Sequence, residues 1–199
     1  MPDINETRAL LEDPDAFGTF GRFTETPVGQ MPAEMRAAFD FTNSLRGLVP
    51  GPHKIWAANP DLLRTIAPIG AYYQADSTLS KAEIEIATLV ICGRWGAAYS
   101  SFEHEKIGVR LGGLDSAKAE ALIAGLPTAF GDPRQQVVYE LSSALAAARV
   151  VPQGLFRRAQ ELLGDAGLVD VTVLMGWFTA VSLTLMAYDV PSNAVGLDQ

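Results

Sequence analysis

Residues 79–113 decide the fold, and they read LSKAEIEIATLVICGRWGAAYSSFEHEKIGVRLGG. Ser80 and Glu83 have the spacing of a capping box, in which each side chain accepts a hydrogen bond from the other residue's backbone N–H and so starts a helix. The apolar run that follows reaches Gly93 and Gly96. Glycine inside a helix costs on the order of 1 kcal/mol relative to alanine. The spacing therefore predicts a break at these glycines, with two helices folded against each other.

Helix signals also dominate the rest of the chain. Prolines in first turns, Asn or Asp caps and Gly stops recur at helical spacing. No alternating strand run with a hairpin turn competes with them. The sequence therefore predicts an all-α, single-domain fold. The helices are predicted at about residues 32–46, 60–74, 81–93, 97 onward, 115–124, 133–148, 153–164 and 168–188. Residues 46–53 are predicted to form a loop, with His53 in the loop or at a helix start.

Composition excludes several classes of protein. The 15 Lys and Arg residues against 23 Asp and Glu residues give a net charge of -8, which repels phosphate backbones, so we expect no nucleic-acid partner. The single cysteine rules out an intrachain disulfide and a CxxC redox pair. Two histidines far apart in sequence argue against a histidine-rich zinc site but leave a carboxylate-rich site open. We expect no metal and no cofactor.

The chain ends and the longest apolar run bear on where the protein works. The start, MPDINETRALLEDPD, is acidic and lacks an apolar core, so it does not resemble a signal peptide. The apolar run over residues 168–190 contains Asp170 and Asp189, which a buried helix explains better than a membrane span. We expect a cytoplasmic protein with no membrane partner.

Glu85 and His104 are the residues in this segment best suited to proton transfer. On one unbroken helix they would lie roughly 28 Å apart, at about 1.5 Å of rise per residue. A break at the glycines lets Glu85 approach Tyr99, Ser100 or His104 in the next helix. Histidine exchanges protons near neutral pH, and a buried carboxylate can be poised to do so. The segment therefore predicts a buried or half-buried acid–base group.

Structural explanations of the same residues stay open. A lone helical histidine is usually packed or at the surface, and Glu85 can belong to a solvated face, although its apolar neighbours favour burial. Tyr99 and Trp95 are most often core aromatics, and Cys92 is most simply a small core residue. Ser100 lacks the GxSxG turn of a serine nucleophile.

The order Glu85, Tyr99, His104 and Gly112-Gly113 resembles the carboxymuconolactone decarboxylase family, which is similar in fold to alkylhydroperoxidase D. The resemblance covers roughly residues 32–191. It leaves residues 1–31 as an N-terminal extension and residues 192–199 as a C-terminal tail. It implies an all-helical subunit that assembles as a homotrimer or homohexamer.

The resemblance also shows which chemistry is missing. The peroxidase branch has a CxxC pair at positions that fall on Ala97 and Ser100, so no thiol pair serves the relay here, and thiol peroxidase activity is disfavoured. Cys92 belongs to the preceding helix and does not align with either position. The Tyr-Glu-Trp typical of the decarboxylase-like branch reads Tyr99-Ser100-Ser101, and Ile84 replaces the arginine that commonly precedes the glutamate.

Two hypotheses follow. In the first, the protein is a cofactor-free lyase or isomerase of a small organic acid or lactone, with His104 as general acid–base and Glu85 as its partner. Tyr99 and Ser100 would hydrogen-bond the substrate, Trp95 would contact it, and Arg94 would be the nearest cation for its carboxylate. In the second, the chain is a non-catalytic subunit of a helical assembly.

Overall fold

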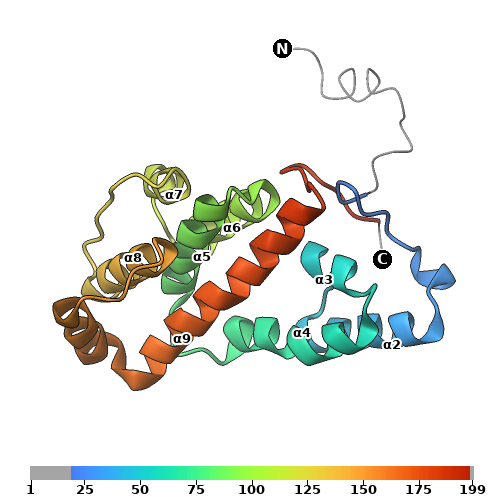
Figure 1. Ribbon diagram of the computed structural model, residues 1–199, viewed down its shortest axis with the longest axis horizontal. Coiled ribbons are helices and arrows are strands. Elements are labelled where there is room, and N and C mark those ends of the chain that lie inside the picture. The colour runs from blue at the N-terminus through green and yellow to red at the C-terminus, as the bar shows by residue number, and fades with distance from the viewer. Residues whose placement is uncertain (1–18, 198–199) are drawn as a thin grey trace, which may run out of the picture.

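Helices make up the fold of residues 19–197, the part of the chain that the computed structural model describes. Within this part there is no strand, and a single isolated bridge joins Phe20 and Phe23. The predicted all-α fold is confirmed. Figure 1 shows the helices, which are α2 (Ala33–Arg46), α3 (Gly51–Trp56), α4 (Pro60–Ala75), α5 (Lys81–Trp95), α6 (Ala98–Arg110), α7 (Ser116–Ile123), α8 (Pro133–Ala146) and α9 (Gln153–Ala187), preceded by a 3-10 turn at Val28–Gln30.

The predicted caps start four of these helices. Asn59 accepts from Leu62 N at the start of α4, and Asp115 and Asp132 cap α7 and α8 in the same way. At α5 both halves of the capping box form. A side-chain cap satisfies backbone N–H groups that have no partner within the helix. The starts of these four helices are therefore confirmed at the predicted cap residues.

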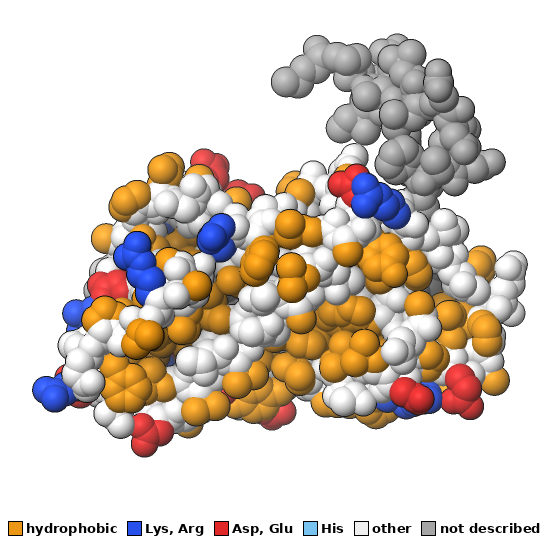
Figure 2. Space-filling view, in the orientation of Figure 1, with side chains coloured by type: hydrophobic (Ala, Val, Ile, Leu, Met, Phe, Trp, Pro, Cys, Tyr) orange, Lys and Arg blue, Asp and Glu red, His pale blue; other side chains and the backbone are white. Residues whose placement is uncertain are grey.

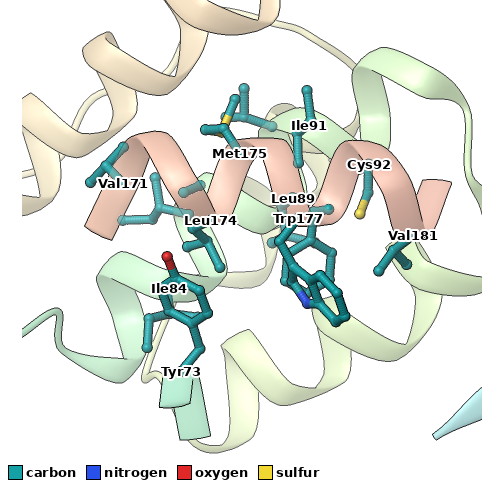
Figure 3. Close-up of a cluster of buried hydrophobic side chains, with 14 of the residues drawn as sticks. Tyr73, Ile84, Leu89, Ile91, Cys92, Val171, Leu174, Met175, Trp177 and Val181 are labelled. Carbon is teal, nitrogen blue, oxygen red and sulfur yellow. The ribbon is translucent and has the colours of Figure 1, made fainter. Parts of the chain in front are cut away.

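Helix α5 is the centre of the molecule. Every residue from Ala82 to Cys92 is buried, because α5 packs against α6, α7, α8 and α9. Figure 1 shows α9 running between the group formed by α5–α8 and the group formed by α2–α4. Figure 3 shows side chains of α5, such as Leu89 and Cys92, interleaved with Leu174 and Trp177 of α9. A helix surrounded on all sides explains why its sequence is apolar around its whole circumference.

Helix α9 joins two predicted helices across a kink. Gly164 has φ 71° and ψ 176°, which is outside helical geometry, so the predicted stop near this glycine is confirmed. The second helix resumes directly after it rather than at Leu168. By length and composition α9 is able to cross a membrane, but core helices of water-soluble proteins meet the same two criteria, and 56% of its most apolar window is buried inside the protein.

One buried carboxylate ties the loop after α4 to α9. Asp170 Oδ1 accepts from Tyr72 Oη at 2.7 Å. Its Oδ2 accepts from Ser77 Oγ at 3.0 Å and from both N and Oγ1 of Thr78 at 2.8 Å. Burial raises the pKa of Asp170, but these hydrogen bonds outweigh burial and the pKa is lowered overall. The loop that leads into α5 is thereby fixed in place.

The described segments before α2 and after α9 meet over α3. Lys54 Nζ lies 2.8 Å from Glu25 Oε2, and both side chains are more than nine-tenths buried. Lys54 also donates to Leu197 O, and Leu197 N donates to Glu25 Oε1. The described parts of the predicted N-terminal extension and C-terminal tail therefore contact each other. Residues 1–18 and 198–199 of those two segments lie outside the described residues.

The prediction for residues 46–53 is partly wrong. The expected loop ends at Pro50, and Gly51 begins the short helix α3, which includes His53. Six residues give too little periodicity to distinguish a helix from a Gly/Pro-rich loop. The helix is stabilised by tertiary packing, since Trp56 Nε1 donates to Thr184 Oγ1 of α9 at 2.9 Å.

Candidate functional site

A glycine turn brings the two halves of the candidate site together. Helix α5 ends at Trp95, and Gly96 adopts the left-handed conformation with φ 69°, which favours glycine. Helix α6 then begins at Ala98 and packs against α5. The break predicted between Gly93 and Gly96 is confirmed.

Glu85 and His104 lie within hydrogen-bond distance. His104 Nδ1 and Glu85 Oε2 are 2.6 Å apart. The Glu85 side chain is fully buried, whereas that of His104 is 21% exposed. Burial alone raises the pKa of Glu85, but its interactions with His104 and Lys81 outweigh burial, so the pKa is lowered overall. Glu85 is therefore held as a carboxylate, which accepts the Nδ1 proton and leaves Nε2 on the opposite side of the ring.

Lys81 is a member of this group that the sequence analysis missed. Its Nζ lies 2.8 Å from Glu85 Oε1, an ion-pair distance without the alignment of a hydrogen bond. The spacing of Lys81 and Glu85 indicated this pair, because residues four apart in a helix lie on the same face. The three side chains form an ordered relay of Lys81, Glu85 and His104.

Packing also holds the His104 ring in place. The ring of Phe178 on α9 meets the His104 ring edge-on, with centroids 4.8 Å apart. Gly108 lies one turn after His104, and a Cβ atom there would stand only 3.3 Å from Glu85 Cβ. A side chain at position 108 would therefore crowd the carboxylate-bearing helix. The glycine allows α6 to approach α5 closely at the site.

Ser100 lies beside the only cysteine of the chain. Cys92 Sγ donates to Ser100 Oγ at 3.3 Å, and Ser182 Oγ is 3.9 Å from the sulfur. All three residues are buried. Burial raises the pKa of the Cys92 thiol to about 11, and the nearby charge of Glu85 acts in the same direction. The thiol is therefore a weak nucleophile, although it lies next to a position where the peroxidase branch would have a cysteine.

Tyr99 faces a different part of the protein. Its ring packs edge-on against Phe20 at 5.6 Å, and its hydroxyl lies against Gly51 of α3. Burial, followed by the charges of Glu103 and Glu25, raises its pKa to about 12. Its contacts are with the N-terminal segment and α3, so the predicted role of Tyr99 beside His104 has no supporting contact.

Arg94 contacts a different part of the protein, and Trp95 is partly exposed. Arg94 Nε donates to Ala146 O at the end of α8, and Arg94 lines a cavity of about 350 Å³ between α5, α7 and α8. Trp95 is 37% exposed. A second cavity, of about 260 Å³, lies between Phe39 of α2 and the chain ends. Neither cavity is lined by Glu85 or His104, so no contact supports the predicted substrate-binding roles of Arg94 and Trp95.

The other histidine is buried without a polar partner. His53 is 2% exposed, and neither ring nitrogen has a hydrogen-bond partner in the described part of the chain. Its ring packs against both Trp56 and Trp177, with centroids 5.0 and 5.8 Å away, and the two indole rings also pack against each other. Burial and then the charge of Arg46 lower its pKa to about 3. Among residues 19–197, no three His, Cys, Asp or Glu side chains are grouped to hold a metal ion.

Comparison with known proteins shows the fold and no more. No family model matches the sequence, and no curated protein does. The fold is similar to that of the debrominase Bmp8. Its apo crystal structure superposes with a TM-score of 0.64 at 12% identity, covering 81% of this chain and 87% of that one. A cysteine-to-alanine variant of Bmp8 in complex with 2,3,4-tribromopyrrole gives the same TM-score and coverage at 13% identity. This likeness supports the all-helical fold and fits the predicted family only loosely.

Proposed function

We propose that the protein is a cofactor-free enzyme that transfers protons on a small organic acid or lactone, in a decarboxylation or an isomerisation. The observation that carries the proposal is the 2.6 Å contact between His104 Nδ1 and the buried Glu85 Oε2. A buried carboxylate is costly to a fold unless it is paired. Here it is paired with the one histidine that retains access to solvent.

The roles of the two side chains follow from this geometry. Glu85 accepts the Nδ1 proton and orients the ring, so that Nε2 is free to accept a proton from a carbon next to a carbonyl. Returning the proton to a different carbon completes an isomerisation. When a carboxylic acid loses CO₂ instead, Nε2 first accepts the proton of the carboxyl group, and the imidazolium returns this proton to the carbanion that remains. Ser100 lies four residues before His104 on α6, about one helical turn away, and would supply a hydroxyl to the substrate.

Thiol chemistry is not part of the proposal. Bmp8 was crystallised with a brominated pyrrole in a cysteine-substituted form. The only cysteine of this chain is fully buried, and burial raises its pKa to about 11. A thiolate at that position would be scarce at neutral pH. Debromination and peroxide reduction through a cysteine are therefore disfavoured here.

A non-catalytic assembly subunit is the alternative. It is favoured by the fact that neither of the two cavities described above is lined by Glu85 or His104. A screen separates the two functions: the purified chain is incubated in D₂O with a panel of small lactones and keto acids, and proton NMR follows deuterium incorporation and product formation. An enzyme accelerates exchange or conversion of at least one compound. An assembly subunit leaves all of them at the rate of the buffer.

A further inference from the structure

Lys81 occupies a position that helix stability does not explain. It is the first residue of α5, directly after the Ser80 cap. A cation there is opposed by the partial positive charge of the helix N-terminus. A Lys that precedes a Glu by four residues is also the less favourable order of such a pair. Glu85 is nevertheless its ion-pair partner, at 2.8 Å from Nζ to Oε1.

The two oxygens of Glu85 therefore serve two different partners. Oε1 faces Lys81, and Oε2 faces His104. The carboxylate is fully buried, whereas Lys81 is 41% exposed. The charges of Lys81 and Glu85 cancel, so a proton added to His104 leaves the group with a net charge of +1. Without Lys81 the same proton would neutralise an isolated negative charge, which favours the imidazolium form.

The described ion pairs of Glu85 are those with Lys81 and His104. On α9 the contacts are uncharged, with Phe178 against the His104 ring and Ser182 beside the Cys92 thiol. On α6 two acidic residues, Glu103 and Glu105, flank His104 in sequence, and Glu103 is paired with Lys106 at 2.8 Å. The balance of charge at the relay therefore depends on Lys81.

We propose that Lys81 is a positioning residue that fixes the direction of proton transfer, because its cation balances Glu85 and keeps His104 neutral with Nε2 as a proton acceptor. The inference rests on the proposed function and narrows it to reactions that begin with removal of a proton. The substrate class is then a small carbonyl compound or lactone with an acidic C–H next to the carbonyl, and the first step forms an enolate while His104 becomes an imidazolium. No oxidant or second reactant is required.

The test reads the protonation of His104 directly and needs no substrate. The full chain is labelled with ¹⁵N-histidine, and its imidazole nitrogens are observed by NMR at pH 7.5. His53→Phe assigns the signals, since the chain has two histidines. We expect His104 in the wild-type chain to be neutral, with the proton on Nδ1. In Lys81→Met the ratio of imidazolium to neutral ring should rise about tenfold, which corresponds to the effect of one neighbouring charge.

Two further variants separate charge from structure. Lys81→Arg keeps the cation and should leave the ratio within about twofold of the wild type. Lys106→Met removes a lysine with the same 41% exposure from α6, and it should also change the ratio by less than about twofold. The inference is overturned if wild-type His104 is an imidazolium or carries its proton on Nε2, or if Lys81→Met behaves as Lys106→Met does. A chain with the expected spectra that converts no compound in the screen would instead contradict the proposed function.

Discussion

His104 Nδ1 lies 2.6 Å from Glu85 Oε2, although nineteen positions separate the two residues in sequence. The contact exists because Gly96 ends α5 in a left-handed turn and α6 returns along it. Gly108 then allows the two helices to approach. A buried carboxylate bound to a half-accessible histidine is an arrangement suited to proton transfer.

Gly93→Ala should destabilise the packing of α7 on α5. A Cβ atom at Gly93 would stand 2.3 Å from Ile123 O, a backbone atom that cannot move aside alone. We expect the free energy of unfolding in urea to fall by about 2–3 kcal/mol. Gly154→Ala is the control, because no heavy atom lies within 4 Å of the added carbon. Equal stability of the two variants would show that α5 and α7 are not in close contact.

His53 should make the protein sensitive to acid. Its pKa is about 3 in the folded state and near 6.5 when exposed in the unfolded state. The unfolded state therefore gains the proton first, and stability is lost as pH falls from about 6.5 toward 3. Between pH 7.5 and 5 the loss should be about 2 kcal/mol. Urea unfolding across this range measures it, with His53→Phe as the variant that cannot titrate; parallel curves for the two chains would refute the prediction.

Cys92 should be inert in the folded protein. With a pKa of about 11, roughly one thiol in a thousand is ionised at pH 8, and the sulfur is buried as well. A disulfide reagent that reports thiolate release should label the folded chain at least about a hundredfold more slowly than the urea-unfolded chain. Cys92→Ala should retain any turnover found in the screen. Rapid stoichiometric labelling of the folded chain would contradict this prediction and would show that Cys92 can act as a nucleophile.

The exposed face of α9 should bind further copies of the chain. Figure 2 shows apolar side chains gathered along the diagonal that α9 follows in Figure 1. Four large apolar residues of this helix are 46–59% exposed, namely Val169, Val173, Leu183 and Met186. Such a surface favours an oligomer, and the family resemblance implies a trimer or hexamer.

Val173→Glu should shift the mass measured by light scattering at micromolar concentration toward that of one chain. Val150→Glu makes the same substitution in a loop, at a residue that is 95% exposed, and should leave the mass unchanged. A wild-type chain that is monomeric under these conditions would exclude the predicted oligomer.

The sequence predicted the features that depend on neighbouring residues. Ser80 with Glu83, Asn59 and Gly96 each act through contacts within a few positions, so their roles were readable without a structure. The meeting of Glu85 with His104 was also predictable, because it needed only one turn between two helices. The role of Asp170 was not, since its partners at Tyr72 and Thr78 lie more than ninety positions away. The directions of Tyr99 and Arg94 depend on how α3 and α8 pack, which no local pattern encodes.

Under the proposed function, Glu85 and His104 act together on a substrate. The most direct measurement is the rate of conversion or deuterium exchange of whichever lactone or keto acid the wild-type chain accepts, compared among wild type, His104→Ala, Glu85→Gln and the control Glu105→Gln. We predict a loss of at least about a hundredfold in the first two variants, with unchanged circular dichroism, and activity near that of the wild type in the control. Full activity in both His104→Ala and Glu85→Gln, or no conversion of any compound by the wild-type chain, would contradict the account.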